Sequence, residues 1–146
     1  VSTALRGVNL LAIDTAPFIY LIERHPDHAP VMRQVLTDLQ TGALSACSSV
    51  ITLTEVLVRP RQAGDAQLEK QYRAILLHAT NFTLVPIDAV VAERAADLRA
   101  SYNLRTPDAL QVAAALSAGC DAFLTNDRAI ARVANMRVLV LSDLTL

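Results

Sequence analysis

Four carboxylates in this sequence have the type and placement needed for a catalytic metal site. They are Asp14, Glu55, Asp108 and Asp127, and each comes from a different segment, just after a predicted strand or on a predicted helix. Carboxylates gathered within a few ångströms cannot all stay ionised without a compensating positive charge. Ligands that offer only oxygen suit the hard cations Mg²⁺ or Mn²⁺ rather than zinc.

An acidic cluster that holds one or two such ions can hydrolyse a phosphodiester. One ion lowers the pKa of the attacking water, and a second about 4 Å away stabilises the leaving oxygen. No histidine or cysteine is placed to do this chemistry instead. The four acids therefore predict metal-dependent phosphodiester hydrolysis.

Short apolar runs that alternate with longer helical patterns predict the elements that must position these acids. The predicted strands are 8–13, 44–48, 82–85, 122–125 and 136–141, all rich in Val, Leu or Ile. Between them the apolar residues recur with the period of a helix, as in the face formed by Leu68, Tyr72, Ile75 and Leu76. This alternation is typical of an α/β fold in which a parallel sheet has helices on both faces.

Open parallel sheets bind ligands outside the carboxyl ends of their strands, so the place of each acid is informative. Asp14 directly follows the first strand and Asp127 lies just past the fourth. Glu55 is on the helix after the second strand. Asp108 lies near the start of a helix for which Thr106 is the predicted N-cap, where backbone N–H groups favour an anion. Four separate segments can thus converge at one edge of the sheet.

Each acid also has a purely structural interpretation. Asp14 could be a helix N-cap, Asp108 could complement the helix dipole, and Asp127 could be an ordinary polar loop residue. Glu55 interrupts an apolar sequence, where burial without a partner would be costly, and a salt bridge to Arg59 one turn later is the alternative. The four together indicate a site more strongly than any one alone.

Other acids are set aside by their positions. Asp121 precedes the fourth strand, so it belongs at the opposite end from Asp127. Asp88 fits an N-cap for the helix that starts at Ala89. Asp143 follows the last strand and stays a minor candidate.

Four segments in order resemble the PIN-domain nucleases, and within them the VapC-type toxins of bacterial toxin–antitoxin pairs. The matching segments are 13–15, 49–55, 104–109 and 123–128, and the resemblance runs from about residue 10 to residue 144. It implies a three-layer α/β/α fold whose five-stranded parallel sheet has the order 3-2-1-4-5. That order would place Asp14 and Asp127 side by side.

The resemblance also implies roles, cofactors and partners. Asp14, Glu55, Asp108 and Asp127 match the metal ligands of the family, and Thr15 and Thr125 match positions where hydroxyls line the site. The implied activity is that of an endoribonuclease using Mg²⁺ or Mn²⁺. The implied partners are an RNA substrate, a small antitoxin protein and a second copy of the chain in a homodimer.

The basic residues are compatible with an RNA substrate. Arg105 and Arg128 flank the predicted acids, and a guanidinium suits phosphate better than an ammonium does. A solvated surface or a surface ion pair is the alternative for either one. The chain has 13 basic and 14 acidic residues, a net charge of −1, which excludes a strongly basic nucleic-acid binder. If the four proposed ligands are left out of the count, 13 basic and 10 acidic residues remain, and the net charge of the rest is +3.

Other functions stay open on the sequence alone. A PIN-like nuclease in RNA processing would need no antitoxin. A phosphoacceptor signalling domain also gathers acids at strand ends, but it needs a lysine after the last strand, and Lys70 is the chain's single lysine. A haloacid-dehalogenase-like phosphatase needs an aspartate at position 16, which is Ala16. A non-catalytic interaction module would leave Glu55 and Asp108 unexplained.

Nothing in the composition divides residues 1–146, so we expect a single domain. Cys47 and Cys120 lack metal-finger spacing and are expected to be two buried thiols, with a disulfide as the alternative. No apolar stretch approaches the roughly 20 residues that span a bilayer, and no signal-peptide pattern is present. A cytoplasmic protein with no membrane partner is therefore expected.

Overall fold

A computed structural model describes residue 1 and residues 3–146, and within them a five-stranded parallel sheet forms the centre of the molecule. The strand order is β3-β2-β1-β4-β5, which confirms the expected order. The strands are β1 (Leu10–Ile13), β2 (Ser45–Ser49), β3 (Phe82–Val85), β4 (Ala122–Thr125) and β5 (Val138–Val140). All five lie where the apolar runs predict them.

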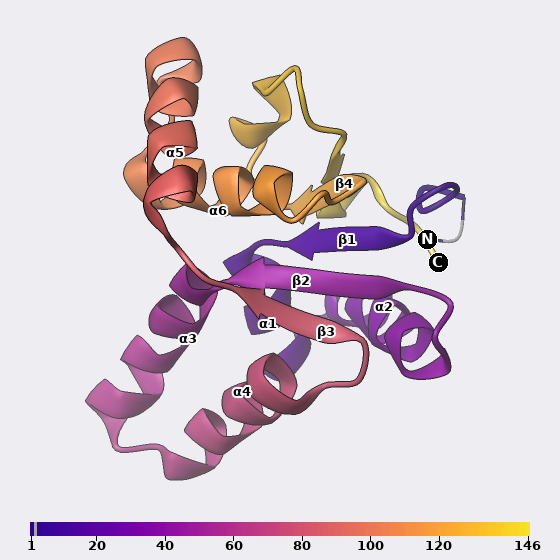
Figure 1. Cartoon of the computed structure of the whole chain (residues 1–146). Helices are drawn as coiled ribbons and strands as arrows, with labels where there is room; N and C mark the ends of the chain where they lie inside the picture. Colours follow the sequence, from indigo (N-terminus) through magenta and orange to yellow (C-terminus); the bar gives the residue numbers. More distant parts are fainter. Residues whose placement is uncertain (2) are drawn as a thin grey trace.

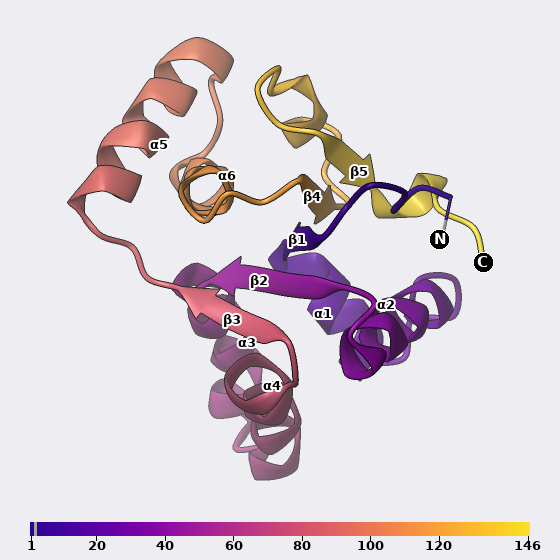
Figure 2. The same ribbon diagram turned by 45° about the vertical axis from the view of Figure 1, so that its right-hand side comes forward.

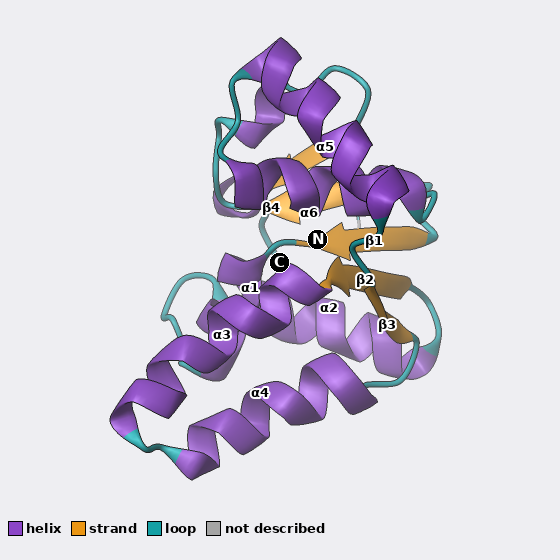
Figure 3. Ribbon diagram, turned by 60° about the vertical axis from the view of Figure 1, so that its left-hand side comes forward, coloured by secondary structure: helices purple, strands orange, loops and turns teal. Residues whose placement is uncertain are grey.

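Helices cover both faces of the sheet and make the three layers of an α/β/α fold (Figures 1 and 3). One face carries α1 (Thr15–Ile22), α2 (Ala29–Thr41), α3 (Val50–Ala63) and α4 (Ala66–His78). The other carries α5 (Ala89–Tyr102) and α6 (Thr106–Ser117). Two short 3₁₀ turns, η1 (Ile130–Arg132) and η2 (Leu141–Asp143), flank β5, and both chain ends lie beside η2 (Figure 2). No helix of the described residues has both the length and the apolar character to cross a membrane.

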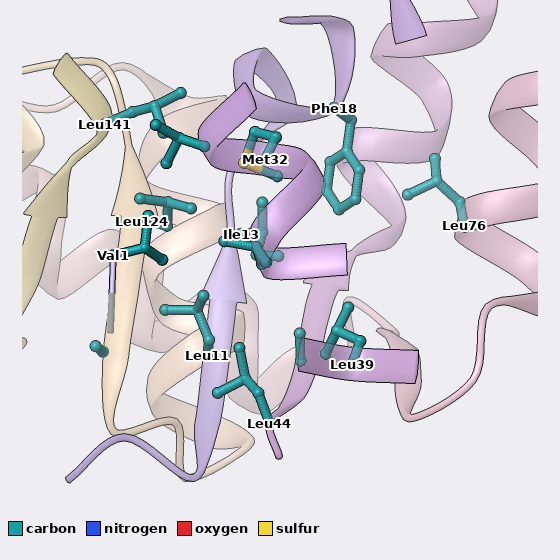
Figure 4. Close-up of a cluster of buried hydrophobic side chains, with 14 of the residues drawn as sticks. Val1, Leu11, Ile13, Phe18, Met32, Leu39, Leu44, Leu76, Leu124 and Leu141 are labelled. Carbon is teal, nitrogen blue, oxygen red and sulfur yellow. The ribbon is translucent and has the colours of Figure 1, made fainter. Parts of the chain in front are cut away.

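The central strands supply two separate cores, because successive side chains point to opposite faces. Leu11 and Ile13 of β1 pack with Leu124 on the side of α1 and α2, as Figure 4 shows. Ala12 and Phe123 pack on the other side against α5 and α6. The sheet is therefore buried on both faces, and the carboxyl ends of its strands are where polar side chains can reach solvent.

The strand register brings segments distant in sequence to one edge. Ile13 pairs with Leu124, and Ser49 pairs with Val85, so these strands end level with one another. In Figure 1 the arrowheads of β1 and β2 point to this edge. Asp121 lies at the opposite end, where its Oδ2 accepts hydrogen bonds from the N–H groups of Asn9 and Leu10.

The structure corrects the predicted start of α6 and shows the state of the two cysteines. The prediction of Thr106 as an N-cap is wrong by one residue: Arg105 is the N-cap, without a side-chain hydrogen bond, and Thr106 is already helical. Pro107 is then the second helical residue, where a missing N–H costs nothing.

Cys47 is buried and Cys120 is half-buried. Both are free thiols, and their Sγ atoms are 3.1 Å apart.

The alanine-rich face of α6 allows this helix to pack closely into the second core. Ala109, Ala113, Ala114 and Ala115 are all at most 2% exposed. Such packing leaves little room for a larger side chain, because protein interiors have the density of organic crystals.

We expect Ala113→Leu to lower the free energy of unfolding by about 1–3 kcal/mol through overpacking. Ala96→Leu, on the exposed side of α5, is the matched control and should change stability little. Urea denaturation of both variants measures the difference. Equal stability of the two would contradict the packing described for α6.

Candidate active site

All eight predicted site residues line a single cleft of about 430 Å³ at the carboxyl edge of the sheet. They are Asp14, Thr15, Glu55, Arg105, Asp108, Thr125, Asp127 and Arg128. The loop after β1, the helix after β2, the first turn of α6 and the segment after β4 each contribute. The strand order explains this convergence, since β1 lies between β2 and β4.

Asp14 is the most constrained of the four acids. It is 9% exposed and is the N-cap of α1, where its Oδ1 accepts a hydrogen bond of 2.8 Å from the Thr15 N–H. Its Oδ2 accepts a hydrogen bond of 2.7 Å from the Thr125 hydroxyl at the end of β4. The N-cap interpretation is therefore correct, and it coexists with a place in the cleft.

The environment of Asp14 makes its ionised form costly. Burial raises the pKa of this carboxyl above its ordinary value of 3.8, and the negative charges of Asp108 and Glu55 add to the effect. The hydrogen bonds from Thr125 and Thr15 act in the opposite direction without cancelling it. A compensating cation would relieve this cost.

Glu55 extends from α3 into the cleft and is held by the first residue of α1. The Thr15 hydroxyl donates a hydrogen bond of 2.8 Å to its Oε1. The alternative of a salt bridge to Arg59 is wrong: the Arg59 guanidinium lies 3.7 Å from the Glu23 carboxylate instead. Glu23 follows the end of α1, so the tertiary fold brings Arg59 a partner that helical spacing could not predict.

The remaining two acids, Asp108 and Asp127, interact with residues close to them in sequence. Asp108 is in the first turn of α6, and its Oδ2 is 3.1 Å from Nε of Arg105, the N-cap residue. Asp127 donates its backbone N–H to the Thr125 hydroxyl oxygen at 3.0 Å. Thr125 therefore connects Asp127 to Asp14, because it accepts from the first and donates to the second.

The two arginines differ in how they are engaged. The Arg105 side chain is 78% exposed, and its pKa is raised by the neighbouring Asp108 carboxylate. Arg128 makes two hydrogen bonds with Asp143, at 2.7 and 3.2 Å, so the ion-pair alternative describes its present state. Both side chains line the cleft, and each is paired with an acid.

Comparison with protein families matches residues 11–136 to the PIN domain. The chain belongs to the PIN-domain family. Comparison with curated proteins gave no match.

Solved structures similar to this PIN domain come from toxin–antitoxin systems. A toxin–antitoxin complex from Klebsiella pneumoniae has 25% identity and a TM-score of 0.68, over 90% of this chain and 97% of that one. A VapBC2 structure from Rickettsia felis, bound to a DNA fragment from its promoter, has 18% identity and a TM-score of 0.72, over 90% and 98%. The sarcin–ricin-loop-cleaving toxin VapC20 from Mycobacterium tuberculosis has 14% identity and a TM-score of 0.66, over 87% and 98%. The last two likenesses show the fold alone.

Several residues of the cleft are absent from the sequence-based prediction. Ala16, Ile19 and Tyr20 of α1 form an apolar wall beside the acids, and Asn126, which also lines the cleft, donates a hydrogen bond of 3.4 Å to the Tyr20 hydroxyl. Their spacing of three and four residues on one helix is a signal that could have identified the wall. Gln111, one turn after Asp108, is hydrogen-bonded to Thr15 beneath the cleft. Its signal is a lone polar residue in the buried alanine-rich face of α6.

The donor set suits a hard divalent cation, since the acids and threonines of the cleft offer only oxygen atoms. Within residue 1 and residues 3–146, no three acidic, imidazole or thiol groups lie close enough together to hold an ion as they stand. Mutual repulsion of carboxylates favours such a spread arrangement. An ion held in part through water molecules would fit this spacing, since Mg²⁺ usually keeps several of its waters.

Asp14→Asn should stabilise the metal-free protein at neutral pH. Because the folded pKa of Asp14 is raised, the folded state binds more protons than the unfolded state between pH 3.8 and that raised pKa. Stability therefore falls as pH rises through this interval, and the cost persists above it. An uncharged asparagine avoids the cost, so we expect its melting temperature in EDTA at pH 7 to exceed that of the wild type by about 4 °C for each kcal/mol relieved.

Thermal melts from pH 7 down to pH 3.5 measure this effect. The advantage of the asparagine variant should shrink as the pH falls, because the wild-type carboxyl becomes protonated in both states. A variant less stable than the wild type at pH 7 in EDTA would contradict the cost assigned to Asp14.

Proposed function

We propose that this PIN domain is a metal-dependent endoribonuclease that hydrolyses RNA phosphodiester bonds with Mg²⁺ or Mn²⁺. The observation that carries the proposal is the convergence of four carboxylates, two site hydroxyls and two arginines on one cleft. Nuclease activity is general for the family to which the chain belongs. A cleft with this combination can take a phosphodiester and a cation together, since arginines attract phosphate while carboxylates hold the cation.

Each side chain has a defined task in this proposal. Asp14, Glu55, Asp108 and Asp127 would hold the ion or ions, directly or through water. Thr125 fixes Asp14 by donating to its Oδ2, and Thr15 fixes Glu55 by donating to its Oε1. A bound divalent ion would supply water activation and stabilisation of charge on the phosphate.

The arginines would bind and orient the substrate backbone. Arg105 can leave Asp108 for a phosphate once a cation neutralises that acid, because its present partner is a surface contact of modest strength. Arg128 would exchange Asp143 for a phosphate oxygen in the same way. The apolar wall of Ile19 and Tyr20 would lie against ribose or base and exclude water from that side.

We expect the purified protein to cleave RNA with Mg²⁺ or Mn²⁺ and to stop when EDTA is added. Asp14→Asn should lower the cleavage rate by at least about 100-fold, a loss typical of removing a group that organises charge in the transition state. A fluorescent RNA cleavage assay with purified protein measures both effects.

Asp121→Asn is the matched control, because it removes an acid from the opposite end of the strands. It should cleave at close to the wild-type rate. Full activity of Asp14→Asn would contradict the proposed site. Activity that EDTA does not affect would contradict the proposed metal dependence.

We further propose that the chain is the toxin of a type II, VapBC-like toxin–antitoxin pair. Its support is the likeness to the complex from Klebsiella pneumoniae, which covers 97% of that chain at 25% identity. A small antitoxin would then block the acidic cleft. The proposal includes a single domain over residues 1–146, a homodimer and a cytoplasmic location, where RNA is available.

Induced expression in bacterial cells tests the toxin proposal separately from the chemistry. Wild-type protein should arrest growth and leave defined RNA cleavage products, whereas Asp14→Asn should do neither. RNA profiling after induction identifies the products. Normal growth with an enzyme that cleaves RNA in vitro would favour the second candidate, a PIN-like nuclease of RNA processing that has no antitoxin.

A further inference from the structure

Gln111 is a buried amide in the alanine-rich face of α6, directly beneath the acidic cleft. Its side chain is 3% exposed, and it follows Asp108 by one helical turn. Its hydrogen bonds join three other segments: the start of α1, the end of β2 and the first turn of α3. A glutamine in this position must have partners for its buried amide, since an unpaired one would be costly.

The amide uses both its hydrogens and its oxygen. Nε2 donates to the Thr15 hydroxyl oxygen at 3.1 Å and to the Thr52 hydroxyl oxygen at 2.7 Å. Oε1 accepts a hydrogen bond of 2.6 Å from the Ser49 hydroxyl. A glutamine amide has two N–H hydrogens, so these two threonines take all that Gln111 can donate.

The Thr52 hydroxyl oxygen is an acceptor within this network. The Ser48 hydroxyl lies 2.6 Å from the Ile13 carbonyl oxygen and 2.7 Å from the Thr52 hydroxyl oxygen, and it can donate its one proton to either. Gln111 Nε2 donates to the same Thr52 oxygen.

The direction of the Thr15 hydroxyl follows from its contacts. The Thr15 proton points to the Glu55 carboxylate, which accepts it. The Thr15 oxygen accepts a hydrogen bond from Gln111 and lies 3.2 Å from the Thr52 hydroxyl oxygen, so a hydrogen bond between the two threonines uses the Thr52 proton. Gln111 donates to both threonines and thereby supports this arrangement.

We propose that Gln111 is a positioning residue that directs the Thr15 hydroxyl toward Glu55 and so fixes that carboxylate for cation binding. This inference rests on the proposed function. Glu55 is exposed on α3, and an exposed glutamate side chain samples many rotamers. Gln111 occupies the Thr15 oxygen from below, which keeps the Thr15 proton on the side of Glu55.

The same threonine also ties Glu55 to Asp14. The Thr15 backbone N–H binds Oδ1 of Asp14, while its hydroxyl binds Oε1 of Glu55. Gln111 therefore acts on the relative placement of two of the four proposed ligands through one residue. Groups that orient metal ligands from behind typically change metal affinity about 10- to 100-fold when they are removed.

The test measures Mn²⁺ binding by titration calorimetry on the purified full chain, together with RNA cleavage as a function of Mn²⁺ concentration. Gln111→Met keeps the length of the side chain but cannot donate. We expect it to raise the Mn²⁺ dissociation constant and the Mn²⁺ concentration for half-maximal cleavage by the same factor, about 10-fold or more. The maximal rate at saturating Mn²⁺ should change much less.

A double-mutant cycle tests whether Gln111 acts through Thr15. Thr15→Val should weaken Mn²⁺ binding, and Gln111→Met should add little to it when the two are combined. Thr15→Ser, which keeps the hydroxyl, should restore binding. Additive effects in the double variant would overturn the proposed route through Thr15.

Val112→Ala is the control for a merely structural effect, because Val112 is fully buried on the same helix and outside the network. It should lower the melting temperature and leave the Mn²⁺ dissociation constant unchanged. If Gln111→Met does not fold, Gln111→Asn replaces it, since its shorter amide keeps polarity but cannot reach both threonines.

The outcomes separate this inference from the proposed function. A wild-type protein that binds no Mn²⁺ and cleaves no RNA overturns both. A wild-type protein that does both, with Gln111 variants of unchanged Mn²⁺ affinity, overturns only the role of Gln111. A shift in affinity equal to that of Val112→Ala would likewise leave Gln111 as a packing residue.

Discussion

A carboxylate buried beside two others at the carboxyl edge of the sheet is the constraint around which this molecule is organised. Burial raises the pKa of Asp14, and the negative charges of Asp108 and Glu55 add to the effect. Hydrogen-bond donors stabilise the ionised form at two of these acids: Thr125 and the Thr15 N–H donate to Asp14, and the Thr15 hydroxyl donates to Glu55. The two buried cores supply the stability that allows such a charged edge to persist, since apolar burial is the main favourable contribution to folding.

The hydroxyls that serve the acids are supported from within the protein rather than by solvent. Ser48 and Thr52 are at most 4% exposed, and Gln111 connects them to the cleft. Every fully buried side-chain nitrogen or oxygen of the described residues has a hydrogen-bond partner. A network in which every group is paired holds its side chains in one orientation. Sites that stabilise charge need groups that are already oriented before the ligand binds.

Strand positions and the acids that follow them could be predicted from the sequence, because apolar runs mark buried parallel strands and their ends meet at one edge. The hydrogen-bond and ion-pair partners of individual side chains could not be predicted in this way. Helical spacing suggested Arg59 for Glu55, but the end of α1 brings Glu23 to that arginine. Gln111 was missed for the same reason: its partners lie 59 to 96 residues away, so its place in an alanine-rich helix could not show which groups it would bind. The Thr106 cap was misplaced because Thr and Pro are compatible with either of two adjacent helix starts.

The sheet order has a consequence for the chain during its synthesis. Asp14 directly follows the first strand, yet the hydroxyl that fixes it comes from Thr125, 111 residues later. A nascent polypeptide therefore exposes its first acid long before β4 is available to dock beside β1. The cleft therefore cannot assemble until nearly the whole chain has been synthesised.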